Sequence, residues 1–187
     1  MYLKQKLTSI KSNKNIPTFV FLDIDDNTHH AWGEPLFTPR NRLKNLIDAA
    51  VKAKARLILV DVDVSQATPV EKSQLHPDDQ ELKSYLSEYV TKCKTSKLDC
   101  PTIVFVRNFS AKPSAIPVIR TGFLEEIINK KSAPYLQWAS SHFYQSEDQI
   151  IRRWSLWEAA CNNVQQPVVI PAIELYRYTR CSSTNYV

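Results

Sequence analysis

Two apolar stretches, Thr18-Phe-Val-Phe-Leu-Asp-Ile-Asp25 and Leu57-Ile-Leu-Val-Asp-Val-Asp-Val64, decide the fold class of this sequence. Each is a continuous run of β-forming residues, which is typical of a strand buried on both faces. Between them, Thr38 and Pro39 predict a helix start, a hydroxyl cap followed by proline at the first helical position. The apolar residues that follow recur at helical spacing: Leu43, Leu46, Ile47, Ala50 and Val51. Strand, helix and strand in this order predict a βαβ unit with parallel strands.

The rest of the chain continues the alternation and then changes character. A second helix is expected from Pro77, and Pro101-Thr-Ile-Val-Phe-Val106 predicts a third parallel strand. A short helix is expected over 122–130, an aromatic hairpin over 135–144 and 150–157, and a last helix over 167–180. The predicted fold is therefore α/β. It has a mixed sheet with a parallel βαβαβ start, a C-terminal antiparallel hairpin and helices on the faces.

Composition excludes several classes of protein. The 187 residues include only two glycines, Gly33 and Gly122, which lie far apart. Phosphate-binding loops and dinucleotide fingerprints need several glycines within a few residues, so both are excluded. The net charge is +5, but the basic residues are scattered, and we expect no nucleic-acid partner.

The chain contains no run of 18 apolar residues and no apolar signal segment at its start. It is expected either to be a whole protein or to be a piece of a larger one, and composition leaves both open. Residues 1–16 are interpreted as an N-terminal stem or tail, and residues 17–187 as one α/β domain.

Carboxylates stand at the ends of the first two predicted strands: Asp23, Asp25 and Asp26 on one, and Asp61 and Asp63 on the other. Ligands of open parallel sheets bind beyond the carboxyl ends of the strands, so these side chains are candidate binding residues. Clustered carboxylates repel one another, and a hard cation or a set of arginines is needed to offset them.

Ion pairing is the preferred explanation for that offset, and we expect neither a resident metal nor a cofactor. The available cations are Arg40, Arg107 and Arg120. Arg40 stands at a helix start, where its charge opposes the helix dipole, so a carboxylate, Asp25 or Asp26, is expected to hold it. Trp32 lies in the loop above this acidic edge and either stacks on a ligand or covers the core.

An enzymatic alternative rests on the first strand. FVFLDIDDNT is similar to the start of haloacid-dehalogenase-like phosphohydrolases, which are magnesium-dependent and open with an apolar strand ending in Asp-x-Asp. In this alternative Asp23 is the nucleophile and Asp25 the acid/base. Asp26-Asn27 stands where that family has Gly-Thr or a similar turn.

The four cysteines, at positions 93, 100, 161 and 181, do not form a zinc-binding pattern. Cys93 and Cys100 are close enough in sequence to join a helix end to a strand start. The alternative is four thiols in a reducing compartment.

The sequence as a whole resembles a type-2 CHASE domain, a cyclase/histidine-kinase-associated sensory extracellular domain. The resemblance spans roughly residues 17–178 and rests on the order and spacing of short motifs. These are Ile24-Asp25-Asp26, Trp32-Gly33-Glu34-Pro35, Thr38-Pro39-Arg40, Leu46-Ile47, Leu57 to Asp61, Asp79 with Leu82, His142, Asp148, Arg152 to Leu156, and Pro171 to Leu175.

This resemblance implies the extracytoplasmic ligand-sensing domain of a bacterial transmembrane receptor with a histidine kinase, cyclase or similar output. The domain itself would not be an enzyme, and membrane helices outside this chain would tether it. An oxidising compartment favours a Cys93–Cys100 disulfide. The expected ligand is an unidentified small molecule, bound at Asp25, Asp26, Trp32, Arg40, Asp61 and Asp63, and a homodimer is left open.

Overall fold

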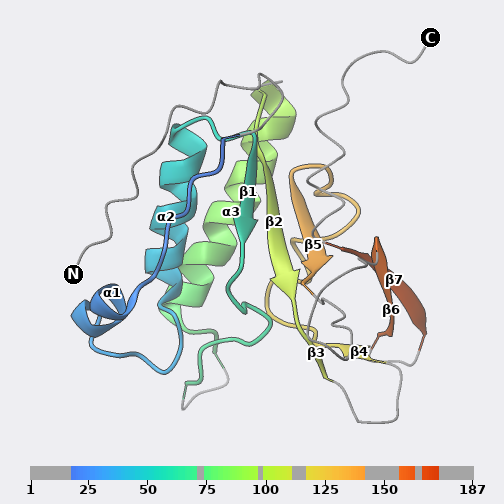
Figure 1. Ribbon diagram of the computed structural model, residues 1–187. Coiled ribbons are helices and arrows are strands. Elements are labelled where there is room, and N and C mark those ends of the chain that lie inside the picture. The colour runs from blue at the N-terminus through green and yellow to red at the C-terminus, as the bar shows by residue number, and fades with distance from the viewer. Residues whose placement is uncertain are drawn as a thin grey trace, which may run out of the picture.

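Two small sheets and a pair of packed helices form the part of the chain that the computed structural model describes, residues 18–70, 74–96, 99–110, 117–141, 156–162 and 166–172 (Figure 1). The first sheet is parallel, in the order β1-β2-β5, with strands Leu57–Val60, Thr102–Arg107 and Leu136–Ser140. The second is mixed, in the order β3-β4-β6-β7, with strands Phe109–Ser110, Val118–Ile119, Trp157–Cys161 and Pro167–Pro171. The predicted α/β class is confirmed.

Two long helices cover one face of the parallel sheet. Helix α2 (Arg40–Lys52) packs against α3 (Pro77–Ser96), and both contribute to one core with the strands (Figure 1). Leu43 and Ile47 of α2 and Leu82 and Leu86 of α3 are almost fully buried there. Both helices lie where their hydrophobic periodicity predicts them. Pro39 occupies the N-cap of α2, so Thr38 lies one residue too early to cap it.

Strand β2 is the centre of the parallel sheet, with β1 on one side and β5 on the other. Its six residues are all buried, as the apolar run predicts. Strand β1 is buried on one face only: Ile58 and Val60 face the core, whereas Leu59 is 47% exposed. The expected strand continued to Val64. The chain leaves the sheet after Val60, so residues 61–64 lie outside the observed strand.

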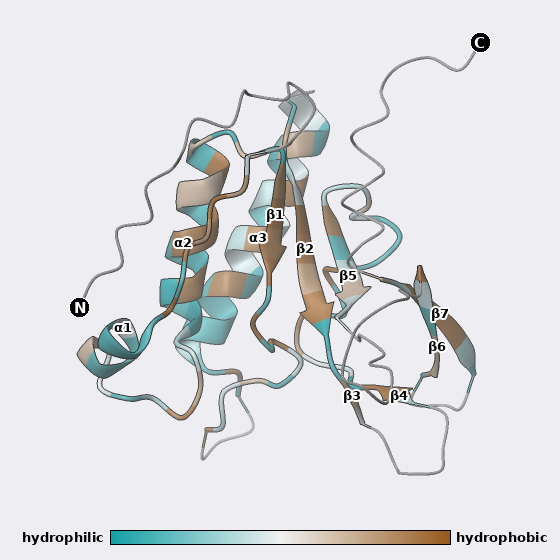
Figure 2. Cartoon of the chain, viewed as in Figure 1, coloured by the Kyte–Doolittle hydropathy of each residue, from teal (hydrophilic) through white to brown (hydrophobic). Residues whose placement is uncertain are grey.

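The expected first strand, Thr18 to Asp25, is wrong. These residues form no strand, and Phe19, Val20, Phe21 and Leu22 are between 52% and 88% exposed. Figure 2 shows the apolar segment running beside α2 toward the short helix α1 (Asp26–Ala31). Among the described strands, β1 is an edge of the parallel sheet, and this segment runs beside α2 in place of pairing with that edge.

Four other expectations are corrected. The loop after Asp26 contains α1, and residues 123–135 form a series of turns in place of a short helix. Strand β5 joins β2 in parallel, and the antiparallel hairpin is formed by β6 and β7. Pro167–Pro171 is therefore strand and not helix. The expected tail at 1–16, the motif residues His142, Asp148 and Arg152, and positions 173–180 lie outside the described residues.

The second sheet joins the first through a bridge between Ser140, at the end of β5, and Ala172. Its own small core consists of Ile119, Ala160 and Ile170. Three segments meet at the carboxyl end of the parallel sheet: the loop that follows β1, the loop that follows β2 and the start of α2 (Figure 1). This is the edge at which a ligand is expected.

Candidate functional site

A small pocket lies between the start of α2 and the loop that follows β1. Its volume is about 200 Å³, less than that of pockets for drug-sized ligands. Leu36, Phe37 and Val62 supply apolar wall, and Thr38, Arg40, Asp63 and Gln66 supply polar groups. The pocket therefore suits a small polar molecule or one group of a larger ligand.

Arg40 is the most deeply placed charge in this pocket, with 1% of its side chain exposed. Its Nη1 donates to Thr38 O at 3.3 Å, and its Nη2 donates to Asp63 O and Gln66 O, each at 3.2 Å. These bonds hold the chain before α2 and the loop after β1 in one arrangement. Arg40 Nε has no hydrogen-bond partner.

Asp79, in the first turn of α3, is the carboxylate that pairs with Arg40. Its Oδ1 lies 3.6 Å from Arg40 Nε, and its side chain is fully buried. Asp79 also accepts hydrogen bonds from Thr68 N at 2.6 Å and Thr68 Oγ1 at 3.0 Å. Burial lowers the pKa of Arg40, while the charges of Asp79 and Asp63 raise it. An arginine keeps its proton in any such balance, so the pair is ionic. The expectation that Asp25 or Asp26 holds Arg40 is wrong.

Asp63 connects the pocket with the end of β2. Its Oδ1 accepts from Ser65 N at 2.8 Å and from Ser65 Oγ at 2.5 Å. Burial raises the pKa of Asp63, but these two bonds, with Asn108 and Arg120, lower it below the usual 3.8. Because Asn108 follows β2 directly, Asp63 couples two loops of the carboxyl edge.

One of the two glycines serves this edge. A Cβ added to Gly122 would lie 2.2 Å from the backbone oxygen of Ser65. Any other residue would therefore push the segment that follows β4 away from the loop that follows β1. Gly122 is the small residue that lets these two segments approach closely.

A second charged group lies at the ends of β2 and β5. Arg107 is 2% exposed, and its Nη2 donates to Glu125 Oε1 at 2.5 Å. Its guanidinium carbon stands 4.4 Å from the ring centroid of Trp138. Of the other two arginines expected to offset the clustered aspartates, the charge of Arg120 lowers the pKa of Asp63, whereas Arg107 pairs with Glu125, which is not one of those aspartates.

The structure brings two of the six predicted binding residues together and places the other four elsewhere. Arg40 and Asp63 share the pocket. Asp61 is exposed just beyond β1. Asp25 caps α1, with its Oδ1 accepting from Thr28 N at 2.8 Å, Asp26 begins that helix and Trp32 ends it. Figure 1 shows α1 beside the lower end of α2, away from the end of β1. The ligand roles of all six stay predictions.

The phosphohydrolase alternative required an apolar strand ending in Asp-x-Asp. Residues 18–25 form no strand, Asp23 is exposed, and Asp25 is occupied as a helix cap. The context that would position a nucleophile beside an acid/base is therefore not formed by these residues.

Sequence reasoning missed three residues of the site: Asp79, Glu125 and Trp138. Asp79 carries an acidic first-turn signal, but a helix-capping role explains that signal equally well. Glu125 lies in a segment of turns and Trp138 in an aromatic run. Their position depends on how the strands are ordered, which no local pattern reports.

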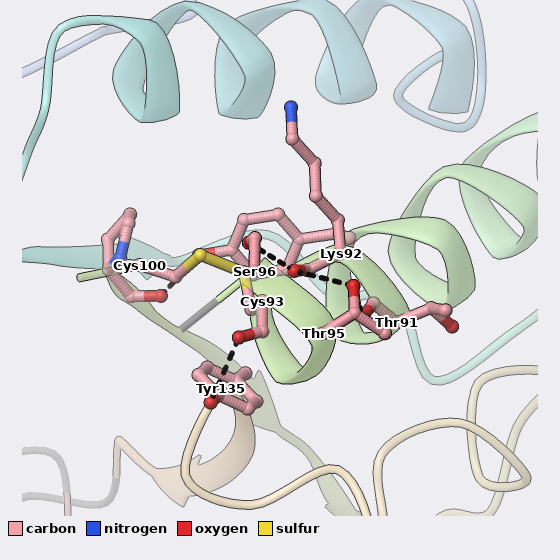
Figure 3. The surroundings of a disulfide bond; sticks show 9 residues. Thr91, Lys92, Cys93, Thr95, Ser96, Cys100 and Tyr135 are labelled. Atoms are coloured by element: carbon pink, nitrogen blue, oxygen red, sulfur yellow. Dashed lines mark hydrogen bonds between the residues drawn. A yellow bond between two sulfur atoms is a disulfide. The ribbon is translucent and has the colours of Figure 1, made fainter. Parts of the chain in front are cut away.

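The disulfide joins Cys93, in the last turn of α3, to Cys100, just before β2 (Figure 3). Tyr135 Oη donates to Cys93 O at 3.4 Å, so the start of β5 is fixed to the same helix end. Tyr89 Oη donates to Pro101 O beside it. The disulfide thus lies at the end of the sheet opposite the charged edge.

These features define an α/β domain whose polar side chains gather at one end of a parallel sheet. The chain belongs to the CHASE2 domain family, because the model of that family matches residues 2–184. CHASE2 domains are sensory domains of signalling receptors and are not catalytic. Comparison with curated proteins and with solved structures finds no match.

Proposed function

We propose that this chain is the extracytoplasmic ligand-sensing domain of a bacterial transmembrane receptor, with a histidine kinase, cyclase or similar output on its cytoplasmic side. Membership of the CHASE2 family supports the sensing role. The observation that carries the location is the disulfide between Cys93 and Cys100. Disulfides form and persist in oxidising compartments and are rare in the cytosol.

The ligand is an unidentified small molecule bound at the carboxyl edge of the parallel sheet. The pocket contains Arg40 and Asp63, and Arg40 joins three segments through Thr38 O, Gln66 O and the Asp79 carboxylate. A ligand that competes for Arg40 changes how α2 and α3 are held together. Such a change becomes a signal only if the ligand binds the two arrangements with different affinity.

The location is tested first by reading the gene on both sides of this segment. Hydrophobic helices on its flanks and a kinase or cyclase beyond them support the proposal. A stop codon directly after Val187, with a native start at Met1, overturns it. Among the described helices, none is long and apolar enough to cross a membrane.

The compartment is tested by blocking thiols in intact cells that produce the full reading frame and then measuring the mass of the domain's peptides. Cys93 and Cys100 should resist alkylation until a reductant is added. Cys161, which is free and half-buried, is the internal control and should be alkylated once the protein is unfolded without reductant. Alkylation of Cys93 and Cys100 without reductant contradicts an oxidising location.

A further inference from the structure

Arg107 is a buried cation with most of its hydrogen-bonding capacity unused. A guanidinium has five N–H donors on three nitrogens. Glu125 accepts from Nη2, whereas Nε and Nη1 are buried without any partner. Buried donors are nearly always paired in folded proteins, so each exception asks for an acceptor.

These unpaired donors are concentrated in one part of the domain. Among the described residues, five buried side-chain atoms have no hydrogen-bond partner, and four of them are donors: Arg40 Nε, Arg107 Nε, Arg107 Nη1 and Trp138 Nε1. Arg107 ends β2, and Trp138 lies on the adjacent strand β5. Arg40 lines the pocket beyond β1. The carboxyl edge of the sheet therefore holds three side chains with unsatisfied donors, and two of them, Arg107 and Trp138, lie on adjacent strands.

Arg107 is also held rigidly. Its guanidinium lies over the Trp138 ring at 4.4 Å, and that ring packs edge-on against Phe105, with centroids 6.0 Å apart. Phe105 is fully buried in β2. A planar fork fixed on an aromatic face is prepared to bind a planar acceptor, because little rotamer freedom remains to be lost.

We propose that the end of β2 and β5 is a recognition site for the carboxylate group of a small ligand, bound by the Arg107 guanidinium stacked on Trp138. A carboxylate matches a guanidinium edge with two parallel hydrogen bonds. Glu125, which is 30% exposed and partly hydrated, already offsets some of the Arg107 charge. A singly charged group therefore suits the site better than a phosphate dianion, whose second charge would be left buried and unpaired.

The 187-residue chain with its disulfide intact is titrated with sodium acetate while its indole N–H signals are followed by NMR. Sodium chloride at matched ionic strength is the control. The chain has four tryptophans, and Trp138→Phe assigns the relevant signal while keeping an aromatic ring below Arg107. We expect the Trp138 signal to move and saturate at millimolar acetate, and the other signals to move much less.

Three variants separate binding from structure. Arg107→Lys keeps the charge but removes the fork, and should weaken acetate binding at least about tenfold. Glu125→Gln removes a competing carboxylate and should strengthen acetate binding several-fold. A group needed only for structure would not produce that gain. Arg42→Lys, on the exposed side of α2, is the matched control and should leave binding unchanged.

Four outcomes would overturn the proposal. The first is a Trp138 signal that does not saturate with acetate, which would mean that water alone fills the site. The second is that all indole signals move as they do with chloride. The third is that inorganic phosphate binds and acetate does not, and the fourth is that Glu125→Gln weakens acetate binding. If Arg107→Lys does not fold, the Glu125→Gln titration still decides between these results.

The proposal names a ligand class for the sensory role and to that extent rests on it, but acetate binding is measured on the chain alone. Acetate binding to a protein whose gene shows no membrane segments would reject the receptor and keep the carboxylate site. A receptor gene whose sensor does not bind acetate would keep the receptor and reject the carboxylate site.

Discussion

Two segments of this chain are built from the same kind of residues and have opposite fates. Thr18 to Asp25 and Thr102–Arg107 are both continuous apolar runs rich in β-forming residues. The second is strand β2, buried along its whole length at the centre of the sheet. The first forms no strand, and Phe21 within it is 88% exposed, whereas Phe105 in β2 is completely buried.

The difference teaches that an apolar run reports suitability for burial and not a place in the sheet. A central strand needs a partner on each side and cover on both faces. Strand β2 has β1 and β5 as partners and two helices over one face. Residues 18–25 lie beside α2, and β1 and β2 are already paired with each other.

The largest effect that sharpens this comparison is expected from Phe105→Ala. The side chain is fully buried in the main core, where its ring packs against Trp138, so its removal leaves a cavity there. We expect the free energy of unfolding to fall by about 3–5 kcal/mol. Urea unfolding, followed by tryptophan fluorescence, measures it. A loss below about 1 kcal/mol would contradict a core centred on β2.

The disulfide gives the next largest effect, because it fastens the chain just before β2 to the end of α3. The double variant Cys93→Ala with Cys100→Ala should lose about 2 kcal/mol, as expected for a cross-link that closes a short loop. Wild-type protein in reductant should match the variant in urea unfolding. If reductant has no effect on the wild type, the bond does not form in solution.

Much of the fold was predictable where a local signal has one physical explanation. The stripes of α2 and α3 indicate helices because 3.6-residue spacing places Leu43 with Ile47 and Leu82 with Leu86 on one face. Strand β2 was predicted from its continuous apolar run, a signal that succeeds here because the run finds a partner on each side. Pro167–Pro171 was misassigned because a short apolar run with proline at each end carries no clear period.

The site was predictable at the level of an edge and not of partners. Parallel strands place their carboxyl ends together, and this brought Arg40 and Asp63 to one pocket. The partner of Arg40 depends on how α3 packs on α2, so Asp79 could not be chosen over Asp25. Asp25 carried its own local signal, since an aspartate before a helical turn is a favoured N-cap.

A smaller effect separates two aspartates, Asp25 at the end of the exposed segment and Asp63 in the loop that follows β1. The folded-state pKa of Asp63 lies below its ordinary value of 3.8, so its contribution to stability is complete above pH 3.8 and is lost as the pH falls through the folded pKa. Asp63 is itself exposed and solvent screens its charge, so Asp63→Asn should cost at most about 1 kcal/mol at pH 6. The difference from wild type should shrink toward pH 3.

Asp25→Asn is the matched control for that pH series. The pKa of Asp25 is lowered by its hydrogen bonds with Thr28, but the side chain is exposed, and asparagine caps a helix equally well. Its stability should therefore follow the wild type at pH 6. If Asp25→Asn is the more damaging variant, residues 18–25 have a structural role that the exposed arrangement does not explain.

The smallest effect is expected from Phe21→Ser, and it is the sharpest test of the comparison. A side chain that is 88% exposed has little apolar surface to return to water, so the free energy of unfolding should change by less than about 0.5 kcal/mol. Urea unfolding of Phe21→Ser and Phe105→Ala in parallel gives the ratio of their losses in free energy of unfolding. A loss of several kcal/mol for Phe21→Ser would mean that this segment is buried in solution. The nearest place for it is then the side of β1 away from β2, which carries no strand among the described residues and where Leu59 is half exposed. Equal losses would thus restore the predicted first strand as a fourth member of the parallel sheet, and unequal losses would keep it outside.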